Sequence, residues 1–352
     1  MYIIYFHNNI NNNNIYLNIN YYYYYMTLTN KKILIFGGTG SLGYEITKRY
    51  INSNNIYAFS RDENKHWHMK LDFLNNKNLH FIIGDIINKD KVNIAIQRVN
   101  PNIIIIAAAM KHVDQCEINQ EQCLNSNLLG VKNILNTIEE HKDSLYPTLE
   151  TVLFVSSDKA CSPINTYGMC KAISEQLIIE KAYYINTIKF VNIRYGNVLN
   201  SRGSIIPLLH NIGNDANKTE FTLTHKEMTR FVMTLEQSVD LIEYAIINGT
   251  SGDTIIPKLI SMNVIDLIEL FSEKYNKPIK TIAIRPGEKM LESLINETQS
   301  SRVEKKGDYY HIKSLFTYNK PILPEIMKDY NSKINPLTKE ELKKYLQSFN
   351  LL

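Results

Sequence analysis

The sequence has few cysteines, little excess charge and no clustered metal ligands. Its four cysteines form no Cys-x-x-Cys pair and lie near no group of histidines. A zinc site or a disulfide framework is therefore not expected, no metal centre is predicted, and a reducing compartment such as the cytoplasm fits best. Net charge is only +4, from 39 basic and 35 acidic residues among 352. So small an excess argues against a nucleic-acid-binding protein.

Charged side chains are also missing from residues 1–25, where asparagine, tyrosine and isoleucine predominate. The stretch lacks the basic start and the apolar core of a signal peptide. Because asparagine interrupts its apolar runs, we expect neither a transmembrane helix nor membrane insertion. Residues 1–29 are predicted to be a low-complexity tail, and the working protein is expected to begin near Met26.

From residue 31 onward, short apolar runs alternate with helical patterns. Strands are predicted at 32–36, 55–59, 79–83, 103–109, 151–155 and 188–193. Helices are predicted at 41–51, 90–98, 120–142 and 166–185. This alternation indicates an α/β fold with a doubly wound parallel sheet that is covered on both faces.

The alternation becomes irregular after residue 200, which predicts a smaller, interleaved C-terminal lobe that binds substrate. The length also favours more than one folding unit, at ~150 residues per domain. We expect a dinucleotide-binding domain at 30–202, completed by parts of 231–258, and the lobe at 203–330. Residues 331–352 are predicted to form a C-terminal helix capped by Thr338.

A glycine-rich turn follows the first predicted strand and precedes a helix. Gly37, Gly40 and Gly43 permit a tight turn, close approach of a pyrophosphate and close packing of helix on strand. The helix N-terminus would offer free amides to the phosphates, as in a Rossmann-type dinucleotide site. Thr39, Ser41 and Leu42 complete the predicted turn.

The end of the second strand distinguishes NADP from NAD. Ser60 and Arg61, with Lys65 nearby, could hold a 2′-phosphate, which favours NADP. The alternative is that Arg61 is a solvated charge and Asp62 binds the ribose, so NAD is the less favoured cofactor. Beyond the later strands, the contacts expected on the cofactor come from Asp85, Ile86, Ala107, Lys111, Val155, Ser156 and Val198.

Two short motifs point to catalysis. Ser157, Asp158 and Lys159 follow the strand at 151–155, and Tyr167 and Lys171 are four residues apart on a predicted helix. The Lys171 ammonium is expected to lower the pKa of the Tyr167 phenol and to bind the cofactor. Tyr167 could then take a proton from a substrate hydroxyl while a hydride leaves for the cofactor.

Together these motifs resemble the extended short-chain dehydrogenase/reductase superfamily. Further stretches resemble its inverting UDP-N-acetylglucosamine 4,6-dehydratases of surface polysaccharide synthesis, and the likeness runs from about residue 31 to 315. They are residues 60–63, 107–113, 157–168, 194–198, 201–204, 228–231 and 285–289. The Asp158–Lys159 pair is the specific part, because glucose-type dehydratases carry Asp-Glu there and 4-epimerases carry neither.

The resemblance implies NADP-dependent loss of water from UDP-N-acetylglucosamine with inversion at C5. Lys159 would be the C5 base and Asp158 the acid for the C6 hydroxyl, with Ser157 and Tyr167 at the C4 oxygen. A base must be partly neutral, so we expect burial and nearby cations to depress the pKa of Lys159. The resemblance also implies a homo-oligomer. Substrate contacts are expected from Lys111, Asn197, Arg202, Arg285 and Glu288.

Some positions depart from the family pattern, and alternatives stay open. Asn200 stands where glycine is usual and Ile87 where arginine is usual, which affects substrate choice more than the reaction. A UDP-hexose 4-epimerase or a C5-retaining 4,6-dehydratase could use the same fold. A catalytically silent dinucleotide-binding protein is the alternative that is not an enzyme.

Overall fold

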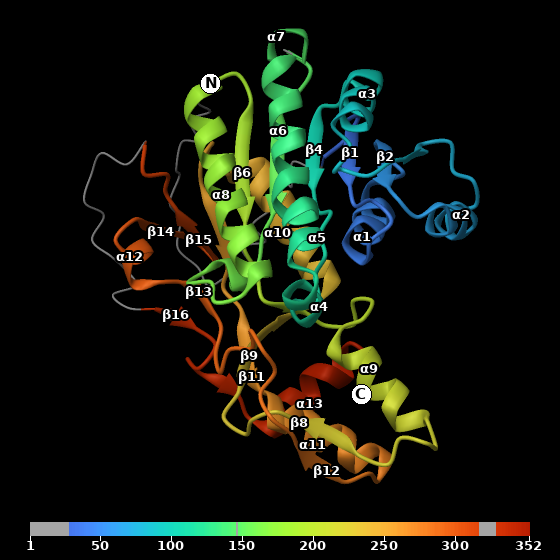
Figure 1. Ribbon diagram of the computed structural model, residues 1–352, viewed down its shortest axis with the longest axis vertical. Helices are drawn as coiled ribbons and strands as arrows, with labels where there is room; N and C mark the ends of the chain where they lie inside the picture. The colour runs from blue at the N-terminus through green and yellow to red at the C-terminus, as the bar shows by residue number, and fades with distance from the viewer. Residues whose placement is uncertain (1–27, 146, 317–328) are drawn as a thin grey trace, which may run out of the picture.

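The computed structural model describes residues 28–145, 147–316 and 329–352, and a large sheet runs through its centre (Figure 1). The predicted tail and the start near Met26 fall almost wholly outside the described residues. In spatial order the nine strands are β14 (Val303–Lys306), β15 (Tyr309–Ile312), β10 (Thr254–Pro257), β6 (Lys189–Ile193), β5 (Thr151–Val155), β4 (Ile103–Ile106), β1 (Lys32–Phe36), β2 (Asn55–Ser60) and β3 (Leu79–Ile83).

The strands from β10 to β3 are parallel, whereas β15 and β14 add an antiparallel edge. The chain starts at the central β1, runs outward to β3, and returns to continue from β4 in the opposite direction. This is the doubly wound Rossmann-type order, and it confirms the predicted α/β class.

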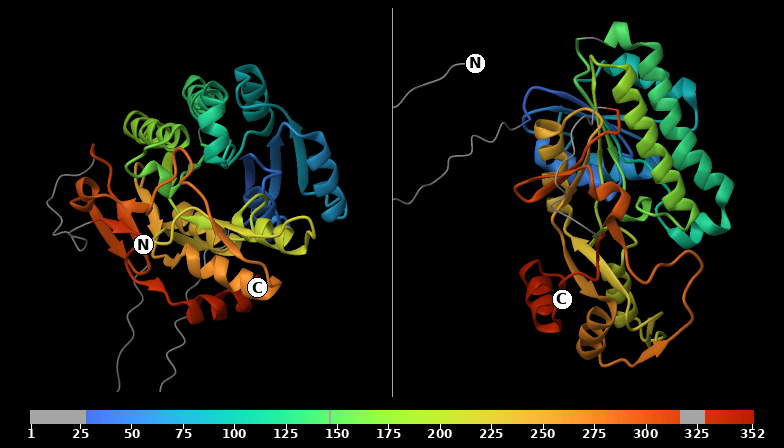
Figure 2. Two further views of the ribbon diagram at one scale, coloured as in Figure 1. Left: turned by 60° about the horizontal axis from the view of Figure 1, so that its bottom comes forward. Right: turned by 90° about the vertical axis from the view of Figure 1, so that its left-hand side faces the viewer.

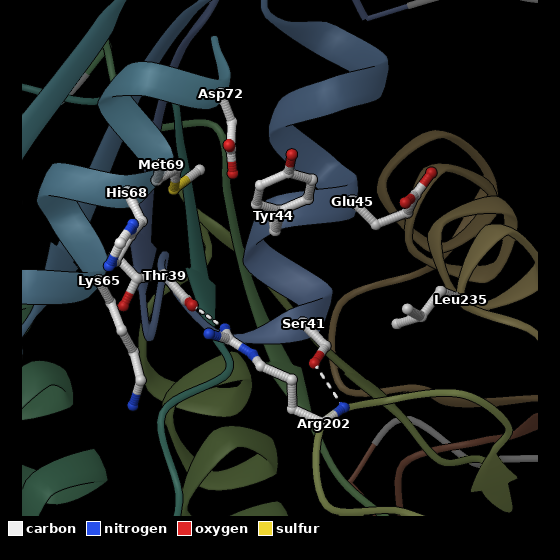
Figure 3. Close-up of a pocket in the computed structure, with 10 residues that line it drawn as sticks. All are labelled: Thr39, Ser41, Tyr44, Glu45, Lys65, His68, Met69, Asp72, Arg202 and Leu235. Carbon is white, nitrogen blue, oxygen red and sulfur yellow. Dashed lines mark hydrogen bonds between the residues drawn. The ribbon is translucent and has the colours of Figure 1, made fainter. Parts of the chain in front are cut away.

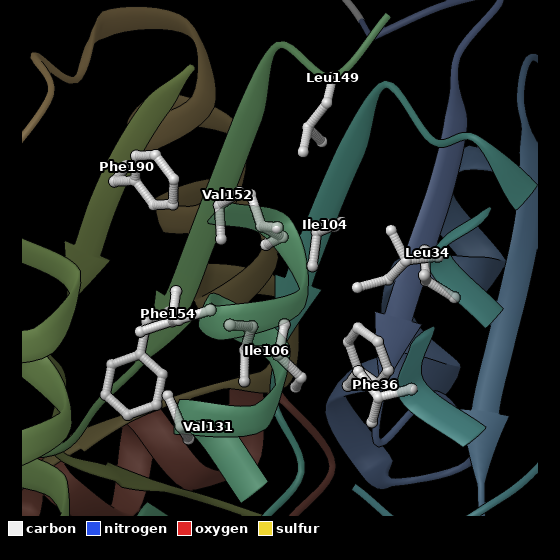
Figure 4. Close-up of a cluster of buried hydrophobic side chains, with 14 of the residues drawn as sticks. Leu34, Phe36, Ile104, Ile106, Val131, Leu149, Val152, Phe154 and Phe190 are labelled. Atoms are coloured by element: carbon white, nitrogen blue, oxygen red, sulfur yellow. The ribbon is translucent and has the colours of Figure 1, made fainter. Parts of the chain in front are cut away.

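Helices cover both faces of the sheet (Figure 2). One face carries α1 (Ser41–Tyr50) and α10 (Leu235–Asn248), and the other carries α3 (Lys89–Val99), α6 (Gly130–Glu140) and α8 (Thr166–Tyr184). Side chains of a strand alternate between faces, so a continuous apolar run supplies both cores. Leu34 and Phe36 of β1 enter the core under α3 and α6 (Figure 4), whereas Ile33 and Ile35 enter the opposite one.

A second lobe lies beyond the carboxyl ends of the parallel strands (Figure 1). A four-stranded sheet forms its base, in the order β17 (Pro336–Leu337), β11 (Ile260–Asn263), β9 (Thr229–Met233) and β7 (Asn197–Val198). A two-stranded sheet joins β12 (Ile279–Thr281) to β8 (Phe221–Leu223). The lobe core gathers side chains from α9 (Ile205–Asn214), α11 (Val264–Tyr275) and α13 (Lys339–Ser348).

A buried ion pair joins the large sheet to the C-terminal region. Arg194 directly follows β6, and its guanidinium donates to the Glu175 carboxylate of α8 at 3.0 and 2.5 Å. The same guanidinium donates to the Leu294 carbonyl of β13 (Ser293–Ile295) and to Gln299 of α12 (Glu297–Ser300). β13 pairs in turn with β16 (Tyr330–Asn331).

Several elements differ from their predicted limits. β4 ends at Ile106 rather than at 109, and α2 (Glu63–Asp72) was not predicted. The helix expected at 120–142 is divided into α5 (Gln120–Leu124), a π-helical segment η1 (Asn125–Leu129) and α6, with α4 (Val113–Ile118) before it and α7 (Lys142–Leu145) after it.

The C-terminal part of the chain also departs from the expected division. Residues 303–312 were assigned to the lobe but extend the large sheet. The helix expected at 331–352 is only α13, which Thr338 and Glu341 cap as a capping box, and strands β16 and β17 come before it. A short polar strand such as Tyr330–Asn331 forms only because the fold brings a partner strand beside it. The hydrophobic periodicity of the sequence therefore could not predict it.

Candidate active site

The glycine-rich turn has the shape that a dinucleotide pyrophosphate needs. Gly37 has a left-handed φ of 93°, and a Cβ there would lie 2.7 Å from the Ala108 amide nitrogen. A Cβ on Gly38 would lie 2.6 Å from the Ala58 Cα. Helix α1 starts after Gly40 without a side-chain cap, so its first amides and its positive dipole end face the turn. These features fit a dinucleotide.

Residues predicted to hold a 2′-phosphate lie at the end of β2, and each already has a partner. The Ser60 hydroxyl lies 2.8 Å from the Thr39 hydroxyl and 2.7 Å from His66 Nε2. Arg61 pairs with Asp85 at 3.3 Å. Lys65 pairs with Asp62, which also caps α2. The Arg61 side chain is 60% exposed, so a phosphate could reach its guanidinium.

Other predicted cofactor residues lie at this same edge, because they follow the carboxyl ends of the parallel strands. Asp85 and Ile86 follow β3, Ala107 follows β4, Val155 ends β5 and Ser156 comes next. Ile86 is buried. The Ser156 hydroxyl is buried without a hydrogen-bond partner. The edge is the place where doubly wound folds bind their ligands.

A pocket of about 400 Å³ opens beside the glycine turn, between α1 and α2 (Figure 3). Arg202 reaches into it: its amide donates to the Ser41 hydroxyl at 3.0 Å and its guanidinium donates to the Thr39 carbonyl. Lys111 donates to the Arg202 carbonyl. Burial, with a contribution from Arg202, lowers the pKa of Lys111. These two predicted substrate residues therefore lie against the turn.

The catalytic candidates of the Ser157–Lys159 motif come together in the short turn η2 (Asp158–Ala160) that follows β5. Asp158 is fully buried, and its Oδ1 accepts from the Ser157 hydroxyl at 2.8 Å and from Lys159 Nζ at 3.0 Å. Lys159 Nζ also donates to Asn197 Oδ1 of β7 at 3.3 Å. The lobe strand thus brings a predicted substrate residue to the predicted base.

Sequence reasoning missed one residue of this cluster. Glu292 is buried, and its Oε1 lies 3.5 Å from Lys159 Nζ. Lys289 Nζ lies 3.8 Å from the other carboxylate oxygen. A single acidic residue inside the otherwise uncharged run 290–295 was the signal that could have found it.

The pKa of Lys159 corrects one expectation. Burial alone would lower it, but the carboxylates of Asp158 and Glu292 together outweigh burial, and the pKa is raised above the ordinary 10.5. Arg230 opposes this effect weakly. The expected depression of the Lys159 pKa is therefore wrong for this arrangement, because two buried carboxylates face the ammonium.

Tyr167 and Lys171 both lie buried on α8, but the expected activation of the phenol is not seen. Burial, and then the charge of Asp158, raise the pKa of Tyr167, while a hydrogen bond with Ser157 opposes them. Lys171 instead donates to the Val155 carbonyl at 2.8 Å and lies 4.5 Å above the Phe154 ring. Its own pKa is lowered to about 8 by burial. The neutral phenol is therefore favoured here.

The loop predicted to hold the nucleotide is docked beside the catalytic turn. The Gly287 carbonyl accepts from Asn165, and Lys289 donates to the carbonyls of Cys161 and Ser162. Arg285 is exposed, and its amide donates to the Glu288 carboxylate at 3.3 Å. An exposed guanidinium on a fixed loop can bind a diphosphate with two parallel hydrogen bonds.

Neither a metal-ligand cluster nor a membrane-spanning helix occurs among the described residues. They contain no group of three or more His, Cys, Asp or Glu side chains placed to hold a metal ion. In residues 28–145, 147–316 and 329–352, no helix combines the length and hydropathy that a membrane crossing requires. All four cysteines are free and buried.

Comparisons with known proteins agree with this architecture. A "UDP-glucose 4-epimerase" of Rickettsia rickettsii is 37% identical over 294 residues, which cover 80% of this chain and 83% of that protein. The solved structure of Pen from Bacillus thuringiensis has a TM-score of 0.85 at 32% identity and covers 93% of this chain and 100% of its own.

A more distant structure shows the fold alone. DesIV, a dTDP-glucose 4,6-dehydratase from Streptomyces venezuelae solved with NAD bound, has a TM-score of 0.62 at 16% identity and covers 74% of this chain and 86% of its own. The family model described as "Polysaccharide biosynthesis protein" matches residues 33–314. The chain therefore belongs to the polysaccharide biosynthesis protein family.

Proposed function

We propose that the chain removes water from UDP-N-acetylglucosamine across C5 and C6 with inversion at C5, giving UDP-2-acetamido-2,6-dideoxy-β-L-arabino-hexos-4-ulose. Fold and family are those of enzymes that modify nucleotide sugars. One observation carries the finer assignment. Asp158 and Lys159 form a buried acid–base pair beside Ser157 and Asn197, at the sheet edge where the dinucleotide turn lies.

Each residue of the pair has a task in dehydration. A dinucleotide held at the glycine turn would supply the hydride acceptor for C4 and the hydride donor for C6. Ser157 and Tyr167 would hold the C4 oxygen, whose oxidation makes the C5 proton acidic. Lys159 would take that proton, and Asp158 would protonate the departing C6 hydroxyl. Reprotonation of C5 from the opposite face inverts that centre.

The cofactor and the substrate would meet at the sheet edge. Gly37 and Gly40 would hold the pyrophosphate of the dinucleotide, and Arg61 favours NADP over NAD through its accessible guanidinium. Arg285 and Glu288 would hold the nucleotide end of the sugar substrate. A working homo-oligomer is also part of the proposal, and light scattering of the purified protein tests it.

A 4-epimerase is the second candidate, because relatives such as the one from Rickettsia rickettsii carry that name. Epimerisation needs hydride transfer at C4 alone, and it leaves the buried Asp158–Lys159 pair without a task. The mass of the product separates the two reactions.

The test is to incubate the protein with UDP-N-acetylglucosamine in D₂O and to follow the product by mass spectrometry and proton NMR. A dehydratase removes one water, and inversion leaves deuterium at C5 with the L-arabino coupling pattern. An unchanged sugar mass with an altered C4 coupling would identify an epimerase and contradict the proposal. Retained C5 configuration would contradict the inversion only.

A further inference from the structure

Glu292 is a buried carboxylate to which the proposed reaction gives no task. Its backbone is fixed on both sides, since its amide donates to the Ser332 hydroxyl at 3.0 Å and its carbonyl accepts from the Ser332 amide at 2.8 Å. The residue is 2% exposed. A carboxylate held this rigidly, away from water, requires a partner for its charge.

The partners of the carboxylate are cations, but one of its oxygens has no hydrogen bond. Oε1 lies 3.5 Å from Lys159 Nζ. Oε2 is buried without a hydrogen-bond partner, with Lys289 Nζ at 3.8 Å. The charge of Arg230 acts to lower the pKa of Glu292. The Arg230 guanidinium, however, donates its hydrogen bonds to the carbonyls of Thr229 and Lys289. The carboxyl group can therefore still take up a proton.

Lys159 needs such an acceptor. An ammonium that faces Asp158 and Glu292 holds its proton firmly and cannot serve as a base. Asp158 is already committed, because its Oδ1 accepts hydrogen bonds from both Ser157 and Lys159. Glu292 touches the same ammonium but has no role toward the sugar.

We propose that Glu292 is a positioning residue that accepts the Lys159 proton and so makes the base available, an inference that rests on the proposed dehydration. In this step an N–H bond of the ammonium breaks, an O–H bond forms on the Glu292 carboxyl group, and the amine regains its lone pair. The amine then takes the C5 proton. No oxidant or further reactant is required.

Burial lowers the cost of this exchange, whereas the carboxylates of Asp158 and Glu292 favour the ammonium form of Lys159. The exchange converts a buried ion pair into two neutral groups, which cost less to keep away from water. Burial, the largest influence, raises the pKa of Glu292, and the Asp158 charge adds to it, while Lys159, Arg230 and Lys289 oppose them. The two groups therefore share a proton as a pair and do not titrate independently.

Proton sharing gives a pH signature that a structural role does not give. In the wild type the transfer is internal, so the titration of Lys159 should add no slope to kcat between about pH 6.5 and 9. In Glu292→Gln the amine must lose its proton to solvent, so kcat should rise about tenfold per pH unit below the pKa of Lys159. The charged groups that face the pair are Asp158, Arg230 and Lys289, and all three remain in the variant.

The experiment compares kcat and C5 deuterium exchange across pH for the wild type and Glu292→Gln. We expect a loss in kcat of at least about 100-fold near pH 7 with a small change in KM, together with the new slope. Asp253→Asn is the matched control, because Asp253 is an equally buried carboxylate that pairs with Lys313 and His311. This control should keep the pH profile of the wild type. A profile of Glu292→Gln parallel to that of the wild type would overturn the proposal.

Two further measurements keep the inference testable. If Glu292→Gln does not fold, Glu292→Asp can be used, because it withdraws the carboxylate by one methylene. An unchanged kcat in Glu292→Asp overturns the proposal. A reduced kcat without the added slope supports it. If the wild type releases no water, the proposed function fails. The titration of Lys159 then tests the pairing of Glu292 with Lys159 by itself. Competitive acetylation of the Lys159 amine should show a lower pKa in Glu292→Gln or Glu292→Asp than in the wild type. An unchanged titration overturns the pairing.

Discussion

Lys159 joins the catalytic turn to the lobe through Asp158, Asn197 and Glu292. Lys159→Ala should abolish C5 exchange and lower dehydration by about 10²–10⁴-fold, because no other amine is assigned to take the C5 proton. Dinucleotide affinity, measured by fluorescence titration, should stay at the wild-type value because the proposed contacts to the dinucleotide come from the glycine turn. Lys313→Ala serves as a control that keeps turnover. Normal turnover by Lys159→Ala would remove this residue from the mechanism.

Lys171 makes folding depend on pH. Its pKa falls from 10.5 to about 8 because burial disfavours the ammonium. Between those values the unfolded chain binds more protons than the folded one, so the Lys171 contribution to stability rises with pH across that window. The free energy of unfolding of the wild type, relative to Lys171→Met, should increase by on the order of 2–3 kcal/mol from pH 7.5 to 10.5. Urea unfolding at several pH values measures this, and a constant difference would contradict it.

Among the elements, the turn between β1 and α1 depends on glycine for two separable reasons. Gly37 combines a left-handed φ of 93° with backbone atoms of Ala108 where a Cβ would lie. Gly307 has a comparable φ of 61° with nothing within 4 Å. Gly307→Ala should cost about 1 kcal/mol from backbone strain alone and leave dinucleotide affinity unchanged. Gly37→Ala should cost more and weaken dinucleotide binding at least tenfold, and equal effects of the two variants would contradict this.

The parallel strands of the sheet could be predicted because each is a short apolar run, and such runs are typical of strands that are buried on both faces. The run at 32–36 is β1 residue for residue. Helix α2 was missed because its sequence, with Lys65, His66, Trp67 and His68 in succession, has no clear apolar face. The division of the helix at 120–142 was also missed, since a π-helical segment leaves no mark on composition.

The candidate site was predictable as a set of residues but not as an electrostatic environment. Ser157, Asp158 and Lys159 are adjacent in sequence, so their proximity was certain. Glu292 joins them from 133 positions away in the chain only because the loop ending at Lys289 docks on the catalytic turn. A second carboxylate reverses the expected direction of the Lys159 pKa shift, and no local pattern contains that information.

At the scale of the whole molecule, α13 closes the lobe that carries Asn197 and Arg230 toward the site. Leu342 of α13 is fully buried in the lobe core. Leu342→Ala should cost about 2–5 kcal/mol of stability and raise KM for the sugar nucleotide, with little change in dinucleotide affinity. Thermal unfolding and steady-state kinetics test this, with the exposed Lys344→Ala as the control. Equal losses of both affinities would contradict a separate role for the lobe.

The buried guanidinium of Arg194 limits how the C-terminal region that contains β13 and α12 could be replaced by that of a relative. It donates one hydrogen bond to the backbone carbonyl of Leu294, an acceptor that any grafted sequence would supply, and another to the side-chain oxygen of Gln299. A chimera could therefore vary freely at the first position but would need an acceptor at the second. Its counter-charge, Glu175, must be inherited together with Arg194, since a lone buried charge costs roughly 3–5 kcal/mol.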